Sequence, residues 1–236
     1  MSRSRVNPVA LITRYPIASA LLLSALAILA AFLYPVEVER SPQDYPWNID
    51  RTAHGSIRVL DLTIGESTVV DARRRVDKEA DISLFVTPSG AISAEVFFQR
   101  IDLGGLGARL VVVADLPQEE LQAMFERGLR ITPIGEGGHR VTPHPEDVAR
   151  IGRAPIASLA YLPTLNVDRE VLRHRFGEPD EVIVEAQEAE LWLYPERGTT
   201  LVVHRDGRRG PVFQYTHPER LLAHFDRLPQ SLESSP

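Results

Sequence analysis

The longest apolar stretch of the chain runs from Tyr15 to Val36, where 22 consecutive residues include no charged side chain. As a helix it would be about 33 Å long, at ~1.5 Å per residue, which is enough to cross a hydrocarbon core of ~30 Å. Tyr15 and Tyr34 stand near its two ends, where aromatic residues gather at membrane interfaces. The pattern predicts a transmembrane anchor over residues 15–36, preceded by a cytoplasmic tail of residues 1–14.

Positive charge flanks only the N-terminal side of this run. Arg3, Arg5 and Arg14 precede it, and the first acidic residue is Glu37. Because positively charged flanks stay in the cytoplasm, the rest of the chain is predicted to lie in the periplasm, across a bacterial inner membrane. A cleaved signal peptide is the alternative. Its apolar region would span about 7–15 residues before a small-x-small site, and residues 32–35 (FLYP) offer no such site.

Beyond the run, residues 37–55 are rich in proline and polar side chains and are predicted to form a linker. Residues 56–128 form a first unit, in which the apolar spacing predicts short helices and strands. We expect a strand at 57–63, a helix opening at 65–67, a hairpin of strands 82–87 and 91–98, a glycine-rich turn at 102–107, a strand at 108–114 and a helix from 115 to 128.

Residues 129–165 show the least regular pattern and are predicted to be a connecting segment with a helix at 145–151. Residues 166–228 form a second unit, followed by a tail of residues 229–236. Asn166 or Asp168 caps a helix that Gly177 ends. We then expect strands at 181–185, 190–194, 199–204 and 211–215, and a closing helix that begins with a capping box at 216–219.

The two units have the same order of elements. Each begins with a short helix, continues with antiparallel strands and ends with a helix, and the corresponding helix starts are about 101 residues apart in the sequence. The predicted fold class is therefore α+β, with one N-terminal transmembrane helix followed by antiparallel sheet and short flanking helices. The two units are candidates for tandem α-β-β-β-α repeats. Coincidence is the alternative, because few residues are identical between them.

A resemblance to a known family covers residues 166–210. It is carried by the helix end Phe176-Gly177-Glu178-Pro179, by the strand at 191–194 (LWLY) and by residues 201–207 (LVVHRDG). Together they resemble the small periplasmic SmpA/OmlA-type domain, a family that includes the small lipoprotein of the outer-membrane barrel-assembly machine. The resemblance implies a similar fold and a non-enzymatic scaffold role. This chain departs from the family in lacking a lipid-modified cysteine and in its greater length.

The composition excludes several kinds of partner and chemistry. The whole chain has a formal net charge of −6, and because three of its basic residues precede the apolar run, the part beyond the run carries −9. An acidic domain disfavours binding to nucleic acid, which needs a basic surface. The chain has no cysteine, which excludes disulfides, thiolate nucleophiles and cysteine-based zinc sites.

No spacing of residues predicts a catalytic, cofactor or metal site. His139 and His144 flank a loop with Glu136, Glu146 and Asp147 near by, and histidine and carboxylates can bind zinc. The chain has no H-E-x-x-H helix and no G-x-S-x-G motif, and its glycine-rich turn lacks the lysine of a phosphate loop. We therefore expect solvated loop histidines and assign no catalytic, cofactor-binding or metal-binding residue.

Four residues of the second unit are candidates for contact with a partner. Trp192 and Tyr194 share one face of a strand because side chains alternate. Such residues are common at binding hot spots, although burial beneath a helix is the favoured reading for Trp192. Arg173 and Arg175 lie on the preceding helix and could contact acidic groups, although plain solvation is the favoured reading for them.

The sequence leaves catalysis open and favours a non-enzymatic role. We expect a single-pass protein of the cell envelope, anchored by a signal anchor, whose periplasmic domain binds an unidentified envelope protein through an edge strand or an apolar groove. The anchor would contact the bilayer through residues 15–36. Two alternatives stay open: a membrane-tethered hydrolase of envelope glycan or peptide that uses His139 or His144, and a domain that binds a lipid or small ligand.

Overall fold

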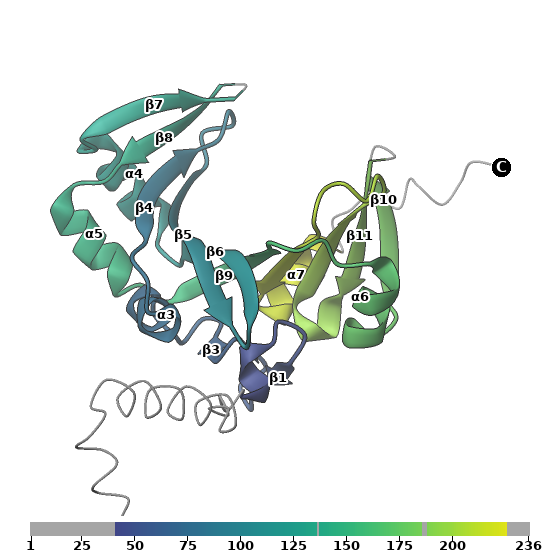
Figure 1. Cartoon of the computed structure of the whole chain (residues 1–236). Coiled ribbons are helices and arrows are strands. Elements are labelled where there is room, and N and C mark those ends of the chain that lie inside the picture. Colours follow the sequence, from purple (N-terminus) through teal and green to yellow (C-terminus); the bar gives the residue numbers. More distant parts are fainter. Residues whose placement is uncertain (1–40, 136, 186–187, 226–236) are drawn as a thin grey trace, which may run out of the picture. The chain divides into compact units, whose positions relative to one another are not determined.

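The computed structural model describes residues 41–135, 137–185 and 188–225 (Figure 1). Two short 3₁₀ helices, η1 (Pro42–Asp44) and η2 (Pro195–Arg197), accompany five α-helices in this part of the chain. The α-helices have eight or nine residues each and are α3 (Val69–Val76), α4 (Gln118–Glu126), α5 (Pro145–Gly152), α6 (Arg169–Phe176) and α7 (Pro218–Phe225).

Strands account for most of the regular structure. In chain order they are β1 (Ile49–Arg51), β2 (Ile57–Val59), β3 (Leu62–Thr63), β4 (Asp81–Val86), β5 (Ile92–Leu103), β6 (Leu106–Ala114), β7 (Arg130–Ile134), β8 (Gly138–Thr142), β9 (Ile156–Pro163), β10 (Glu181–Glu185), β11 (Ala189–Tyr194), β12 (Thr199–His204) and β13 (Val212–Thr216).

These strands form two sheets. The smaller has the order β1-β2-β3, and the larger has ten strands in the order β10-β11-β12-β13-β9-β6-β5-β4-β8-β7. Neighbouring strands are antiparallel throughout the larger sheet. Strand β9 pairs with β13 on one side and with β6 on the other. This strand therefore joins the meander that follows α6 to the meander that follows α3.

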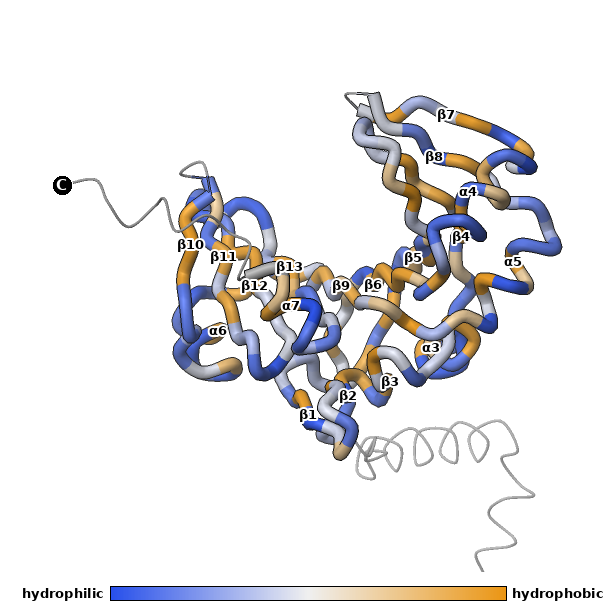
Figure 2. The backbone as a smooth tube through the Cα atoms, turned by 180° about the vertical axis from the view of Figure 1, so that it is seen from behind, coloured by the Kyte–Doolittle hydropathy of each residue, from blue (hydrophilic) through white to orange (hydrophobic). Residues whose placement is uncertain are grey.

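The strand register aligns large apolar side chains across the sheet. Directly paired positions form a row on one face, and every member of that row is at most 2% exposed. Because side chains alternate along each strand, residues two positions apart on the same strands continue that buried face. The row consists of Trp192, Leu201, Phe213, Tyr161, Leu110 and Phe98. Figure 2 shows the hydrophobic stretches at β9, β6 and β5 in the middle of this sheet.

Short helices cover the buried face. α3 turns Val69, Ala72 and Val76 inward and packs against β5 and β6. α6 packs against the other half of the face, where the ring of Phe176 meets that of Phe213 edge-on with centroids 5.0 Å apart. Helices as short as these are marginal alone, so they owe their stability mainly to this packing.

The predicted strand at 57–63 is instead a tight hairpin. Val59 pairs with Leu62, and the two residues between them, Leu60 and Asp61, have φ of 53° and 64°. Positive φ at both central residues is the geometry of a type I′ turn, which usually selects asparagine or glycine. Leu60 is fully buried, and that burial offsets the cost of about 1–2 kcal/mol for a left-handed non-glycine residue.

The structure corrects the predicted α+β class, because the described chain is mostly β and ten of its thirteen strands form one continuous sheet. The tandem α-β-β-β-α arrangement is wrong as well. Three strands lie between α3 and α4, but four lie between α6 and α7. In addition, the connecting segment of residues 129–165 contributes three strands, β7, β8 and β9, that were not expected. Only its helix α5 was predicted.

The single-pass transmembrane description, with its signal anchor, is corrected as well. No helix among residues 41–135, 137–185 and 188–225 is long and apolar enough to cross a membrane. The predicted anchor over residues 15–36 and the predicted tails of residues 1–14 and 229–236 lie outside the described residues.

Gly198, just before β12, and Gly207, in the turn after it, provide a matched test of close packing. Both have positive φ, 53° and 61°, but a Cβ on Gly198 would lie 2.1 Å from the carbonyl oxygen of Thr216, whereas a Cβ on Gly207 meets nothing within 4 Å. We expect Gly207→Ala to cost about 1 kcal/mol of unfolding free energy, from backbone strain alone. Gly198→Ala should cost about 3 kcal/mol or more because the backbone must also move. Urea denaturation of the two variants measures this, and equal losses would contradict it.

The N-terminal cap of α3 predicts a stability that depends on pH. Asp71 accepts hydrogen bonds from the side chain and the backbone of Thr68, and these bonds lower the pKa of its carboxyl below 3.8. Stability from a lowered carboxyl pKa is present above 3.8 and is lost as the pH falls through the folded pKa. We expect Asp71→Asn to cost about 1 kcal/mol at neutral pH and nothing in strong acid. Thermal unfolding of both proteins across this pH range would show a constant difference if the idea is wrong.

Candidate functional site

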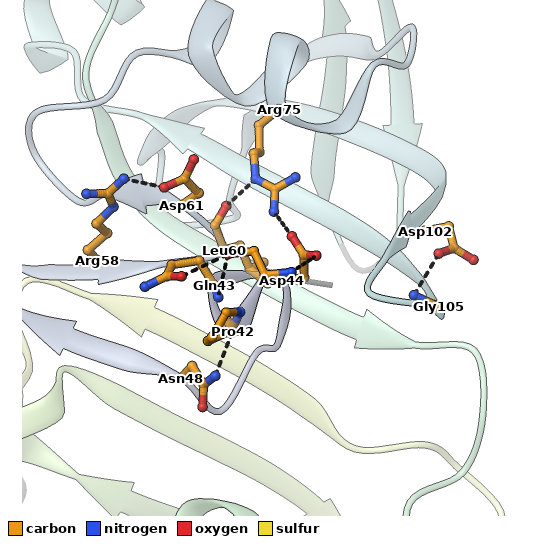
Figure 3. A network of polar contacts seen from close by, with 11 residues as sticks. Pro42, Gln43, Asp44, Asn48, Arg58, Leu60, Asp61, Arg75, Asp102 and Gly105 are labelled. Carbon is orange, nitrogen blue, oxygen red and sulfur yellow. Dashed lines mark hydrogen bonds and ion pairs between the residues drawn. The ribbon is translucent and has the colours of Figure 1, made fainter. Parts of the chain in front are cut away.

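Residues 41–51, which the sequence analysis placed in a linker, are held against the sheet domain by polar contacts (Figure 3). Arg75 of α3 forms an ion pair with Asp44 and donates a hydrogen bond from Nε to the carbonyl of Leu60, at 3.1 Å. Within the segment, the amide of Asn48 donates to the carbonyl of Pro42 at 2.5 Å. The structure differs from a free linker here because these carbonyl and carboxylate groups have fixed partners.

A second set of contacts attaches the same segment to the other half of the sheet. The hydroxyl of Tyr215 donates to the carbonyl of Pro46 at 2.7 Å, and Arg197 donates to the carbonyl of Trp47 at 3.2 Å. Burial raises the pKa of Tyr215 well above 10, so its hydroxyl stays protonated and remains a donor. The segment therefore holds the indole ring of Trp47 beside the sheet.

An apolar pocket of about 280 Å³ lies between this segment, the sheet and α6. Two of its rings, those of Tyr161 and Phe213, are stacked with centroids 5.8 Å apart and are almost fully buried. The ring of Trp47 stacks on that of Tyr45, outside the lining, at 5.1 Å. We call this cavity the Trp47 pocket. Its main lining residues are Pro46, Trp47, Tyr161, Leu165, Val171, Leu172, Arg175 and Phe213.

Exposed apolar side chains mark the rim of the Trp47 pocket. Leu165 is 71% exposed and Val171 is 44% exposed. In the described part of the chain, the other exposed large hydrophobic residues lie at or beside the two edge strands of the large sheet, and they are Leu129, Ile131, Ile134, Val182 and Val184. Such residues are unremarkable singly, but their grouping at a pocket and at two sheet edges indicates binding surfaces.

Opposite charges stand at the two ends of the Trp47 pocket. The guanidinium of Arg175 lies over the ring of Trp47, 4.8 Å from its centroid. No ion pair joins Arg175 to a carboxylate of the described residues. Asp168, which also lines the pocket, precedes α6, two helical turns before Arg175 and thus about 10 Å from it along the axis.

The floor of the pocket is uncharged at ordinary pH. Burial raises the pKa of Tyr161 to about 12, and Asp102 adds to the effect because its charge disfavours a phenolate near by. The hydroxyl of Tyr161 donates to the carbonyl of Leu106 at 3.4 Å. The pocket therefore offers an occupant an apolar floor with charge only at its ends.

The structure separates the four residues predicted to contact a partner. Trp192 is 0% exposed, and its indole nitrogen donates to Glu190 at 3.0 Å. Tyr194 is also buried, and its hydroxyl donates to the carbonyl of Gly177 at 2.9 Å. These two residues lie in the core, beneath α6, so neither reaches the surface. Their shared face was predicted, and it is the buried face.

The two arginines of α6 that were predicted to contact a partner, Arg173 and Arg175, have different neighbours. Arg173 stacks on the ring of Trp192, 4.9 Å from its centroid, and its Nε lies 3.3 Å from a carboxylate oxygen of Glu178. Arg173 thus packs against the core beside β11. Arg175 alone reaches the Trp47 pocket, so it is the one candidate that the structure brings to a concave site.

The loop histidines are placed apart from any cluster of ligands. His144 caps α5, where its Nδ1 accepts a hydrogen bond from the backbone of Glu146, and Asp147 is buried in a bidentate pair with Arg127. His139 lies in β8, and Glu136 is outside the described residues. In the part of the chain that the structure describes, no group of three or more His, Cys, Asp or Glu residues could hold a metal ion.

Sequence reasoning missed the Trp47 pocket. Its lining comes from the segment before β1, the start of β6, strands β9 and β13, the loop of residues 165–168 and helix α6, and only Arg175 had been a candidate. The one signal in the sequence was Trp47 itself, a large aromatic residue in an otherwise polar, proline-rich stretch.

No protein-family model, no curated protein and no solved structure matches this chain. The resemblance of residues 166–210 to SmpA/OmlA-type domains therefore stays a prediction.

The hydrogen bond from Tyr215 to Pro46 is expected to stabilise the fold and to fix the position of Trp47. Tyr215→Phe leaves the carbonyl of Pro46 without its donor and should cost about 1–2 kcal/mol of unfolding free energy. It should also increase quenching of tryptophan fluorescence by acrylamide, because Trp47 is partly exposed whereas Trp192 is buried. Tyr194→Phe is the control, since it removes a similar bond, to the carbonyl of Gly177, but leaves the hydrogen bonds to Pro46 and Trp47 in place. Equal quenching in both variants would show that Tyr215 does not position Trp47.

Proposed function

We propose that the described domain is a non-enzymatic binding module, and that the Trp47 pocket accepts an apolar side chain from a partner protein. The observation that carries this proposal is a concave apolar site with an exposed apolar rim, to which Arg175 contributes a cation that has no carboxylate partner among the described residues. Apolar pockets that receive a few anchoring side chains are the usual centres of protein interfaces.

The size of the pocket favours a side chain over a whole cofactor. Sites for small molecules enclose about 300–1,000 Å³, and the Trp47 pocket, at about 280 Å³, lies at the lower end of that range. A leucine, phenylalanine or tryptophan side chain fills a space of this order. Its burial would add to the hydrophobic contact made by Leu165 and Val171 at the rim.

The charges at the two ends suggest the polarity of the partner segment. An acidic group opposite Arg175 would form a charge-assisted hydrogen bond beside the ring of Trp47. A basic group would suit the other end, near Asp168. The occupant proposed is therefore a segment with a central apolar anchor between an acidic and a basic residue.

Two other functions remain as alternatives. A lipid or another small amphiphile with an acidic head group would use the same apolar floor and the same arginine. For a hydrolase of envelope glycan or peptide, no contact of His139 or His144 in the described chain lends support. The predicted location in the periplasm and the predicted indifference to nucleic acid stay predictions, since neither follows from the pocket.

Site-specific photo-cross-linking in cells tests the proposal. A photoreactive amino acid at position 165, on the pocket rim, should give one discrete protein adduct that mass spectrometry can identify. The same amino acid at position 79, whose glutamate side chain is 95% exposed and remote from the pocket, should give no such adduct. Val171→Asp should abolish the adduct because it places a charge where the apolar anchor enters.

Charge reversal distinguishes specific binding at the Trp47 pocket from nonspecific association. Arg175→Glu should reduce binding of the identified partner segment about tenfold, and reversal of the acidic residue in that segment should restore it. Arg74→Glu, at an exposed arginine of α3, is the matched control and should leave binding unchanged. A lipid adduct at position 165 would support the second function instead, and identical adducts at positions 165 and 79 would refute both.

A further inference from the structure

The large sheet has two edges, and they differ in what they offer to a neighbour. Strand β7 forms one edge and contains Pro133, which has no N–H to donate to a further strand. Strand β10 forms the other edge and contains no proline. Proline is a common device that protects an edge from pairing, so β10 is the better template for an additional strand.

Val182 and Val184 of β10 face one side of the sheet, and Glu181, Ile183 and Glu185 face the other. Val182 pairs with Trp192 and Val184 pairs with Glu190, so both valines lie on the face of the sheet that α6 covers at β11. They are nevertheless 41% and 48% exposed. α6 reaches only as far as β11, where Arg169 and Arg173 lie over the ring of Trp192. The cover thus ends one strand short, and β10 presents two uncovered valines beside its free edge, where Figure 2 shows a hydrophobic stretch.

Charge limits which strand can pair there. Residues 181–185 read Glu-Val-Ile-Val-Glu, the same in both directions. If a second copy paired antiparallel about Ile183, Glu181 of each copy would face Glu185 of the other. Like charges directly across a pair of strands destabilise it, and they do so twice in this arrangement. The edge is thus protected against its own copy, while the same two carboxylates attract a strand that carries basic residues at those positions.

From this geometry we infer a second binding surface: the free edge of β10 takes up an extended segment of another protein that has β-branched residues between two lysines or arginines. Backbone hydrogen bonds to the edge would provide affinity, and the alternating side chains would provide selectivity. The surface is separate from the Trp47 pocket, which lies on the side of α6 that faces β9. The inference therefore does not rest on the proposed function.

A short labelled peptide tests the inference with the full-length chain. Its centre is Lys-Val-Thr-Val-Lys, and the control peptide carries Glu in place of both lysines. Fluorescence anisotropy at neutral pH should detect binding of the basic peptide alone. The double variant Glu181→Lys/Glu185→Lys should weaken that binding about tenfold and gain affinity for the acidic peptide. Glu66→Gln/Glu79→Gln, which removes two acidic residues away from the edge, should change neither.

Methylated peptides separate strand pairing from simple charge attraction. N-methyl groups on alternate residues of the basic peptide remove the backbone donors on one side only, so one of the two methylated forms should lose binding and the other should keep it. Equal binding of both forms, or no inversion of preference in the charge-reversed variant, would overturn the inference. A protein that binds neither peptide would show that the two glutamates only keep copies of the chain apart.

Sedimentation provides a check that needs no partner. Glu181→Gln/Glu185→Gln keeps the shape of both side chains but removes the repulsion between copies. This variant should self-associate at neutral pH at concentrations where the wild-type chain and the Glu66→Gln/Glu79→Gln control do not. If it sediments as the wild type does, the edge of β10 is not competent to pair.

Discussion

The pairing of β9 on both of its sides is the constraint on which the rest of the structure depends. Each meander has its own hairpins, but the two meanders meet only through this strand within the large sheet. Tyr161 of β9 stands between Leu110 and Phe213, so one aromatic side chain completes a buried row across both halves. A shift of β9 by one residue would turn this row to the opposite face and break the core in the middle.

The central row also explains why a segment far away in sequence is ordered. Residues 41–51 lie where the two halves meet. Arg75 pairs with the carboxylate of Asp44 on one side, and Tyr215 and Arg197 donate to the carbonyls of Pro46 and Trp47 on the other. Hydrogen bonds of this kind contribute little net energy singly, yet a buried carbonyl without a donor is costly, so these contacts specify position more than they add stability. The consequence is a rigid indole at the rim of an incompletely filled space, and that space is the Trp47 pocket.

Local signals in the sequence predicted the strands from 181 to 216 to within a residue or so, because glycine or proline delimits most of their ends, as Pro179, Gly198 and Gly210 do. The same reasoning missed β9, whose sequence IASLAYLP shows no regular alternation and lies among prolines. Leu60 concealed a turn, since leucine does not favour positive φ and the aspartate beside it is only a weak signal without a glycine. The pocket was beyond reach for another reason: its walls come from segments more than 160 residues apart, and only the fold brings Trp47 to Phe213.

The two edge strands of the large sheet, β7 and β10, are protected against pairing with a further strand in different ways. Pro133 removes a donor from β7 permanently, whatever approaches it. The glutamates of β10 repel by charge, and charge repulsion becomes attraction when the approaching strand is basic. The covering helices add to this asymmetry, because α6 reaches β11 and leaves the valines of β10 in contact with solvent. A basic partner strand can reverse the repulsion by the glutamates, so the edge at β10 distinguishes one partner from another. The missing donor of β7 only excludes partners. Selectivity at the edges of this sheet therefore lies at β10.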